Sequence, residues 1–351
     1  MIQGILALDT SCYTTSCALV EVSGRARADL RLPLPVPPGG RGLRQAEAVF
    51  HHLVQLPRLV ERVMEVARSE DVRVTAVAAS TRPRPPRDSY LPVFRAGEGF
   101  GRAVAAALGV PFVELSHQEG HLGAVWNPGL PDTVLALHVS GGTTELLRLQ
   151  GGAAREAVSL GTSLDLHAGQ FLDRVGVAMG LPFPAGAHLD RLAMAASGDR
   201  EASPSSAPGA GGGPTSPGGQ PGGTPEVAIP VTVRGYRPSF AGPEAAALRL
   251  IAQGTAPALV ARAALLCVAR ALEKMVLAAL EAGEPPVVLV VGGVAASALV
   301  RDRLRHRLAH PAVGVRLHFP PPELCTDNAV GVGRWAAGSP LRKGLDGDGV
   351  E

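Results

Sequence analysis

The chain has 351 residues, a length that suits two lobes better than a single core. Hydrophobic residues make up 46% and charged residues 18%, which indicates a globular protein and excludes a disordered one. The formal net charge of +2 is small for a free-standing nucleic-acid binder, so any contact with RNA should be local or shared with a partner.

Apolar runs separated by turn residues define the predicted elements. In the first part of the chain we expect strands at residues 5–8, 17–22, 74–79 and 110–115, and helices at 43–67 and 97–108. A hydroxyl-rich turn at 9–16 and a proline- and arginine-rich loop at 81–87 interrupt them. In the second part we expect strands at 133–139, 143–149, 287–291 and 313–319, and helices at 164–179, 243–253, 257–282, 295–309 and 326–337.

Strands alternate with helices throughout, which predicts an α/β fold. In each half of the chain, two early strands flank a turn of small residues, at 9–16 in the first half and at 140–144 in the second. This repetition indicates an approximate internal duplication. Duplicated halves of this kind are the plan of the actin/Hsp70/sugar-kinase (ASKHA) class, in which two lobes face a central nucleotide cleft. We therefore expect a first lobe at 1–108 completed by the helix at 326–337, a second lobe at 109–325 with a disordered Gly/Pro/Ser insert at about 197–225, and a flexible tail at 338–351.

The sequence shows neither a secretory nor a membrane pattern. The start of the chain leads directly into a strand, and Arg262, Arg270, Glu273 and Lys274 interrupt the longest apolar stretch, at 256–282. The four cysteines include no Cys-x-x-Cys pair, which argues against a disulfide framework or a thiolate zinc site. We expect a cytoplasmic protein with no membrane partner.

The segment Ser116-His117-Gln118-Glu119-Gly120-His121 follows a strand and opens a helix. Histidines at positions i and i+4 share one helical face and can share one metal ion, although two polar residues at a helix start explain the pattern equally well. Glu119 is the third of the five residues, so this is not the His-Glu-x-x-His motif of zinc peptidases.

The segment Cys325-Thr326-Asp327-Asn328-Ala329 follows a strand and a proline run. Thr326 or Asp327 could serve as a helix N-cap. Asp327 could instead complete a two-histidine, one-carboxylate site with vacant positions, which suits iron or another divalent ion.

Three weaker signals suggest ligand contacts. Two of them are glycine pairs at the ends of predicted strands, in His138-Val139-Ser140-Gly141-Gly142 and in Gly292-Gly293. Glycine there lets backbone N–H groups approach a phosphate or nucleotide, but each pair is also typical of an ordinary turn or of close packing. Asp173 could accept hydroxyl groups of a ribose or substrate, or be a solvated helical residue.

Together and in order, these segments resemble the TsaD family over roughly residues 2–337, apart from the insert. The family patterns include His-x-Glu-Gly-His, Val-Ser-Gly-Gly-His-Thr, Gly-Gly-Val-Ala-Ala-Asn and Cys-Thr-Asp-Asn-Ala. The resemblance implies metal-dependent transfer of a threonylcarbamoyl group from threonylcarbamoyl-adenylate (threonylcarbamoyl-AMP) to N6 of the adenosine beside the anticodon of tRNA. It also implies TsaB-like and TsaE-like partner subunits.

By position, the resemblance implies one divalent metal at His117, His121 and Asp327, with Fe²⁺ expected and Zn²⁺ or Mg²⁺ as alternatives. It implies an adenylate or ATP in the cleft. The implied substrate contacts are His138, Val139, Ser140, Gly141, Gly142, Asp173, Gly186, Asp190, Gly292, Gly293 and Ser297. No catalytic residue is assigned.

Several positions depart from the family patterns. Tyr13-Thr14 stands where the family has an acidic pair, the loop at 81–86 replaces a Gly-Pro-Gly loop, and Thr143 replaces a histidine. Three functions are therefore open: a tRNA acyltransferase; an altered paralogue that binds metal and nucleotide but has another carbamoyl acceptor or a regulatory role; and, least favoured, a metallopeptidase.

Overall fold

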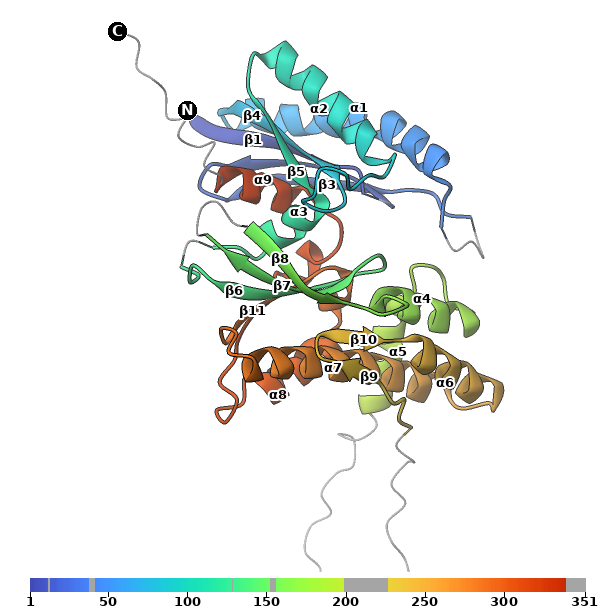
Figure 1. Ribbon diagram of the computed structural model, residues 1–351. Helices are drawn as coiled ribbons and strands as arrows, with labels where there is room; N and C mark the ends of the chain where they lie inside the picture. Colours follow the sequence, from blue (N-terminus) through green and yellow to red (C-terminus); the bar gives the residue numbers. More distant parts are fainter. Residues whose placement is uncertain (12, 38–41, 128, 152–155, 199–226, 339–351) are drawn as a thin grey trace, which may run out of the picture.

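The computed structural model describes residues 1–11, 13–37, 42–127, 129–151, 156–198 and 227–338. The expected insert lies outside these residues from 199 onward, as does the expected tail from 339 onward. Two five-stranded sheets are stacked in the molecule, each with helices on its faces (Figure 1).

The first sheet has the strand order β3-β2-β1-β4-β5. The first three strands are antiparallel neighbours, and β4 and β5 continue parallel to β1. Its strands are β1 Ile2–Asp9, β2 Thr14–Glu21, β3 Ala26–Pro33, β4 Val72–Arg82 and β5 Phe112–Ser116.

The second sheet repeats this plan with the order β12-β11-β6-β7-β8. Strands β6, β7 and β8 are antiparallel neighbours, and β11 and β12 run parallel to β6. The repetition confirms the predicted ASKHA-type two-lobe fold. The strands are β6 Val134–Val139, β7 Thr144–Gln150, β8 Glu156–Thr162, β11 Val287–Val291 and β12 Arg316–His318, and a separate hairpin pairs β9 Thr232–Arg234 with β10 Arg237–Ser239.

Alternation along the strands decides what each sheet face buries. In β1, Leu6 and Leu8 pack into one apolar cluster with α1 Gln45–Ser69 and α2 Phe94–Leu108. Ile5 and Ala7 point to the opposite face, as successive side chains of a strand do, and pack against α9 Ala329–Ala337.

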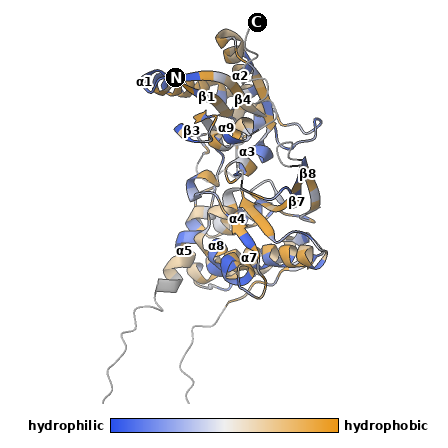
Figure 2. Ribbon diagram, turned by 90° about the vertical axis from the view of Figure 1, so that its left-hand side faces the viewer, coloured by the Kyte–Doolittle hydropathy of each residue, from blue (hydrophilic) through white to orange (hydrophobic). Residues whose placement is uncertain are grey.

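The helices α9 and α3, His117–Gly123, lie between the two sheets (Figures 1 and 2). One cluster contains side chains from both sheets and from both helices, so these helices form a shared middle layer. The outer face of the second sheet carries the remaining helices, α4 Ala168–Ala178, α5 Gly186–Gly198, α6 Ala241–Ala252, α7 Pro257–Glu281 and α8 Ala298–Leu308.

Glycines allow α3 and α9 to touch backbone to backbone. A Cβ atom added to Gly331 would lie 2.0 Å from the carbonyl oxygen of Gly120, and one added to Gly123 would lie 2.1 Å from that of Gly331. Real Cβ atoms essentially never approach so closely. The contact thus joins the helix that carries the two histidines to the helix that follows Asp327.

For three of the predicted helices, side-chain contacts explain why the helix begins or breaks at another residue. The helix expected at 164–179 starts only at Ala168, because Asp165 accepts hydrogen bonds from the backbone N–H groups of Phe240 and Ala241 at the start of α6. The helix expected at 295–309 is divided at Ser297 into a 3-10 turn, Gly293–Ala296, and α8.

No helix in the described part of the chain is both long and apolar enough to span a bilayer.

The third change concerns the end of the chain. The helix expected at 326–337 begins at Ala329, and neither Thr326 nor Asp327 caps it. Asn328 is the N-cap, because its side-chain oxygen accepts a hydrogen bond from the N–H of Gly331 at 2.9 Å. The Asp327 carboxylate therefore has no capping role.

Candidate metal centre and cleft

The helix α3 starts with a reciprocal cap that fixes where its histidines point. The Oγ atom of Ser116 accepts from the N–H of Glu119 at 3.2 Å, and Oε2 of Glu119 accepts from the N–H of Ser116 at 2.6 Å. The cap places His117 at the first position of the helix and His121 one turn later. It also engages the Glu119 carboxylate, which is therefore not free to act as a general base.

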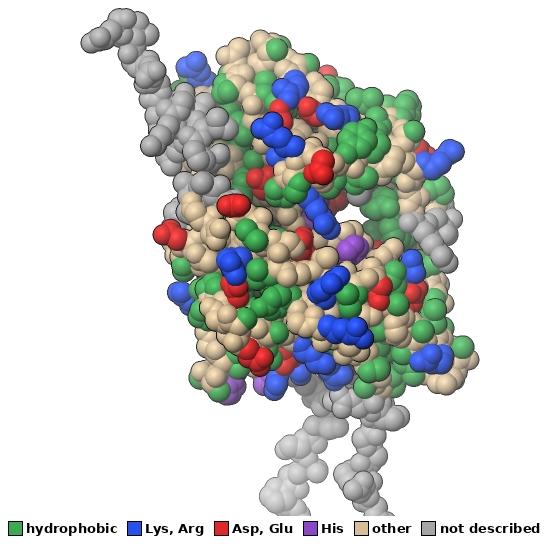
Figure 3. All heavy atoms as spheres, viewed as in Figure 1, with side chains coloured by type: hydrophobic (Ala, Val, Ile, Leu, Met, Phe, Trp, Pro, Cys, Tyr) green, Lys and Arg blue, Asp and Glu red, His purple; other side chains and the backbone are tan. Residues whose placement is uncertain are grey.

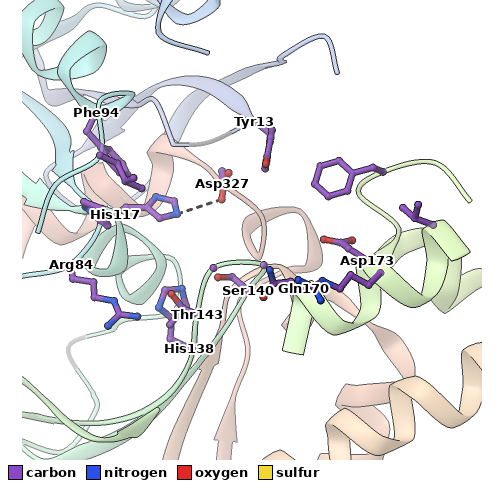
Figure 4. Close-up of a pocket in the computed structure, with 17 residues that line it drawn as sticks. Tyr13, Arg84, Phe94, His117, His138, Ser140, Thr143, Gln170, Asp173 and Asp327 are labelled. Carbon is purple, nitrogen blue, oxygen red and sulfur yellow. Dashed lines mark ion pairs between the residues drawn. The ribbon is translucent and has the colours of Figure 1, made fainter. Parts of the chain in front are cut away.

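The structure brings His117, His121 and Asp327 together. Their ligand atoms all lie within 4.8 Å of one another. Nε2 of His117 lies 3.4 Å from Oδ1 of Asp327 (Figure 4). Nε2 of His121 lies 3.7 Å from the same oxygen. Two atoms that bind one ion at about 2.1 Å each with a tetrahedral angle lie about 3.4 Å apart, so the spacing fits a shared ion.

The hydrogen-bonding state of His121 also fits a ligand. Its side chain is 2% exposed, and Nε2 has no hydrogen-bond partner among the described residues. A buried polar atom without a partner is unfavourable, and an ion bound at Nε2 would satisfy it. Two imidazoles and one carboxylate are a donor set that suits iron(II) or zinc(II).

Asp9, at the end of β1, is a member of the site that the sequence did not reveal. It is fully buried, and its Oδ1 lies 3.1 Å from Nδ1 of His117. The hydroxyls of Ser11 and Ser80 donate to the same carboxylate. A carboxylate on the far nitrogen of a metal-binding histidine fixes the ring and strengthens its donor atom.

Electrostatics separates the two histidines. Burial opposes a charge on His117, but Asp9 and Asp327 outweigh it and raise the pKa of His117 to about 10. Burial and the neighbouring His117 lower the pKa of His121 to about 4, so this ring is neutral. Despite its burial, Asp9 has its pKa lowered to about 2, chiefly by His117. Without an ion, a protonated His117 thus takes the position of a cation between two carboxylates.

The loop that carries Asp327 is held by a buried arginine of α8. The guanidinium of Arg301 donates to the carbonyl of Pro320 at 2.7 Å and contacts the sulfur of Cys325 at 2.9 Å. The amide nitrogen of Asn328 donates to the carbonyl of Thr326 at 2.8 Å. These bonds fix the backbone on both sides of Asp327.

A cavity of about 510 Å³ opens beside this cluster, and His117 and Asp327 line it. Figure 3 shows the molecule hollowed between the lobes, with a histidine side chain at the edge of the hollow. Both lobes contribute side chains to the wall (Figure 4), including Tyr13, Arg84, Phe94, His117, His138, Ser140, Gly141, Gly142, Thr143, Gln170, Asp173, Arg174, Phe183 and Asp327.

The turn at 140–143 lies against the start of α4. The N–H of Ser140 donates to the carbonyl of Thr143 at 2.7 Å, and the N–H of Gly169 donates to the carbonyl of Ser140 at 3.2 Å. A Cβ atom on Gly169 would lie 2.6 Å from backbone atoms of this turn, so only glycine allows the contact. The N–H groups of Gly141 and Gly142 have no acceptor among the described residues and remain available to a ligand.

Asp173 lines the cavity one helical turn beyond Gly169. Its Oδ1 accepts from the N–H of Ala185 at 2.7 Å. Burial, opposed by backbone hydrogen bonds from Ala185 and Gly186, raises the pKa of Asp173. Among the predicted substrate contacts, Asp173 thus lies in the wall with His138, Ser140, Gly141 and Gly142.

The other predicted contacts are not in the wall of this cavity, and their roles remain predictions. Val139 is a core residue, and Gly292 packs against its carbonyl at a backbone φ of +93°. Ser297 donates to Asp190 at 2.5 Å, and Asp190 also accepts from the N–H of Ala298, so the two residues cap α8 together. Gly186 and Gly293 are likewise outside the wall.

Four of the positions that depart from the family patterns lie in the wall: Tyr13, Pro83, Arg84 and Thr143. The rings of Tyr13 and Phe183 meet edge to face across the cavity at 5.3 Å. Arg84 lies near two further histidines. Burial and the charge of Arg84 lower the pKa of His167. Burial and nearby positive groups, Arg84 among them, also lower the pKa of His138. Cys12, in the same turn as Tyr13, lies outside the described residues.

Comparison with known proteins gives consistent results. Residues 38–333 match the family described as TsaD, tRNA N6-adenosine threonylcarbamoyltransferase. The chain is 33% identical over 364 residues to the protein of that name from Prochlorococcus marinus strain MIT 9313, covering 99% of this chain and 93% of the relative. It is 32% identical to the protein of the same name from a strain of Thermus thermophilus, covering 92% and 89%.

Solved structures share the fold at low sequence identity. Full-length HypF superposes with a TM-score of 0.57 at 12% identity, covering 99% of this chain and 47% of HypF. Component A of the (R)-2-hydroxyglutaryl-CoA dehydratase of Acidaminococcus fermentans has a TM-score of 0.51 at 15% identity, covering 98% and 99%. These similarities support the two-lobe fold and carry no argument about activity.

Proposed function

Because this chain belongs to the TsaD family, we propose that it is a metal-dependent acyltransferase that makes threonylcarbamoyladenosine in tRNA. The donor is threonylcarbamoyl-adenylate, and the acceptor is N6 of the adenosine 3′ of the anticodon. The observation that carries the proposal is the cluster of His117, His121 and Asp327, of which His117 and Asp327 line a cavity between the lobes. TsaB-like and TsaE-like subunits are the partners to test.

His117, His121 and Asp327 would hold one divalent ion, Fe²⁺ in the first instance. Such an ion supplies Lewis-acid polarisation of an acyl group. Asp9 would orient His117 for this role through the contact at Nδ1. The unpaired N–H groups of Gly141 and Gly142 would bind the phosphate of the adenylate, and Asp173 would accept hydroxyl hydrogen bonds.

The cavity's contribution is positioning and exclusion of water. Phe94, Leu91 and the Tyr13–Phe183 pair form apolar parts of its wall. A mixed anhydride is open to hydrolysis, so limiting water favours transfer to the amine of the acceptor base. None of the described wall residues is assigned as a covalent nucleophile.

The test is transfer of labelled threonylcarbamoyl from the adenylate to unmodified tRNA that reads ANN codons, with partner subunits added. We expect product with the metal-loaded protein and none with His121→Ala. The control His306→Ala changes an exposed histidine of α8 and should leave the yield unchanged. Absence of product from the metal-loaded, partner-supplemented protein would contradict the proposal.

A second candidate, the altered paralogue, is favoured by one observation. Tyr13 and Arg84 line the cavity at positions where the family has an acidic residue and a Gly-Pro-Gly loop. The double variant Tyr13→Asp/Thr14→Glu restores the acidic pair. Product from this variant and not from the wild type would support the paralogue. The metallopeptidase is disfavoured, because its candidate base Glu119 is engaged in the cap of α3.

A further inference from the structure

Arg84 places a positive charge in the wall of the cavity without a counter-charge. Its guanidinium makes no hydrogen bond or ion pair with any residue that the structure describes. The side chain points toward His138 and Thr143 (Figure 4). Arg87, three residues later in the same loop, is exposed and does not line the cavity.

The backbone around Arg84 is held in place. The carbonyl of Pro83 accepts from the N–H of Gln118 at 3.1 Å, which ties the loop to α3. The N–H of Arg84 donates to Oγ of Ser89 at 3.2 Å, and Nε of Arg82 donates to the carbonyl of Pro85 at 3.1 Å. The arginine therefore extends from a fixed loop, which lowers the entropy lost when it binds a ligand.

His138 adds a buried donor to the same wall. Nε2 of Gln118 donates to a carboxylate oxygen of Glu145 at 3.0 Å, which fixes the orientation of the amide. The same nitrogen lies 3.2 Å from Nδ1 of His138, so Nδ1 accepts and the ring proton is on Nε2. His138 is 3% exposed, and its Nε2 has no acceptor among the described residues.

The carboxylates nearby do not satisfy these donors. Glu145 is bound by Gln118, Asp327 faces the two metal-site histidines, and Asp173 is bound to the backbone of Ala185. A guanidinium and an N–H donor without acceptors match an oxyanion, and the fork of an arginine matches a carboxylate in particular.

We propose that Arg84, assisted by His138, binds the carboxylate of the carbamoylated amino acid in the acyl donor. This assignment rests on the proposed function, and it identifies the residues that would select the acyl group of the donor. A carboxylate is favoured over the phosphate because Arg84 and His138 lie beside the metal-site histidines, where the acyl group must react. The unpaired N–H groups available to a phosphate belong to a different part of the wall, the turn at Gly141 and Gly142 that follows β6.

The experiment measures dissociation constants of three probes by calorimetry. They are a non-hydrolysable analogue of threonylcarbamoyl-adenylate, the same analogue with its carboxylate converted to a carboxamide, and AMP. The proteins are the metal-loaded wild type, Arg84→Gln, Arg84→Lys and the loop control Arg87→Gln. Both arginines are at least partly solvent-accessible, so each variant should fold.

We expect the wild type and Arg87→Gln to bind the acid about 10-fold or more tightly than the amide. Arg84→Gln should lose that preference while its affinity for AMP stays unchanged. Arg84→Lys should retain part of it, because lysine keeps the charge but not the fork.

Two results would overturn the assignment: equal binding of acid and amide by the wild type, or an Arg84→Gln variant that loses AMP affinity as strongly as acid affinity. The second result would make Arg84 a phosphate contact. Failure of the proposed function would give a different result. The preference for the acid over the amide would still depend on Arg84, but the transfer assay would yield no modified tRNA.

Discussion

Oδ1 of Asp9 lies 3.1 Å from Nδ1 of His117, although 108 residues separate them in the sequence. This contact ties the end of the first strand to the first residue of α3. It turns the other nitrogen of His117 toward Asp327, 3.4 Å away. The metal centre we propose therefore depends on a residue that does not touch the ion.

Replacing Asp9 by asparagine tests this dependence. The substitution keeps the shape of the side chain but removes its charge, so His117 becomes a weaker and less firmly oriented ligand. We expect metal affinity to fall about 10- to 100-fold, measured by competition with a coloured chelator. Asp302→Asn, at a side chain that is 70% exposed, is the control. Equal affinities for Asp9→Asn and wild type would show that the contact is only structural.

Metal should stabilise the folded protein, because it binds His117, His121 and Asp327 only when the fold holds them together. At 100 times the dissociation constant, a ligand adds about 2.7 kcal/mol to the free energy of unfolding. We expect the Tm to rise with Fe²⁺ or Zn²⁺ and to fall with EDTA. His121→Ala should remove this response and His306→Ala should keep it. A response that survives in His121→Ala would place the ion elsewhere.

The glycine contact between α3 and α9 should be intolerant of a methyl group. In Gly331→Ala, the new Cβ would meet the carbonyl of Gly120, and we expect a loss of about 1–3 kcal/mol in urea unfolding. Metal affinity should fall as well, because the two helices position the ligand residues. Gly99→Ala is the matched control: that helical glycine faces open space, so a gain of up to about 1 kcal/mol is expected. Similar results for both variants would refute the close contact.

Stability should decrease in mild acid because of His52 on α1. Its side chain is buried, Nδ1 lies 2.8 Å from Oγ1 of Thr15, and burial lowers its pKa to about 4. In the unfolded chain the pKa is about 6.5. Between these values only the unfolded state takes up the proton, so falling pH reduces the free energy of unfolding by roughly 1.4 kcal/mol per unit, about 3 kcal/mol in all.

The variant His52→Gln isolates this effect from the other titrating groups. Glutamine cannot take up the proton, so its unfolding free energy should fall less steeply between pH 6.5 and pH 4 than that of the wild type. His306→Gln, on the exposed surface of α8, should follow the wild-type curve. A His52→Gln variant with the wild-type slope would contradict the prediction.

The sequence predicted a duplicated alternation of strands and helices, because the buried strands are apolar runs. It missed β3 and β8, edge strands whose side chains are largely exposed or half-buried and therefore lack a clear pattern. It also missed α5. Asp165 was read as part of a helix, because its role as acceptor for the start of α6 depends on a contact 75 residues away.

In the candidate site, too, the sequence predicted local relationships but not contacts between distant segments. The spacing of His117 and His121 is local, so the sequence could pair them, and the resemblance supplied Asp327. Asp9, Arg84 and the tautomer of His138 depend on contacts between segments that are distant in the chain. A buried aspartate at the end of an apolar strand was the one signal that could have identified Asp9.

The placement of α9 has a consequence for how the protein is made. Strands β1 and β2 are synthesised before α9, yet one of their apolar faces is covered by that helix, at residues 329–337. During synthesis this apolar face stays exposed to solvent until about 300 further residues have been added, so it is a surface that a chaperone can bind. A fragment that contains the first sheet, which ends with β5 at residue 116, but lacks α9 would leave this face uncovered, so the first lobe should be expressed only with α9 attached through a designed linker.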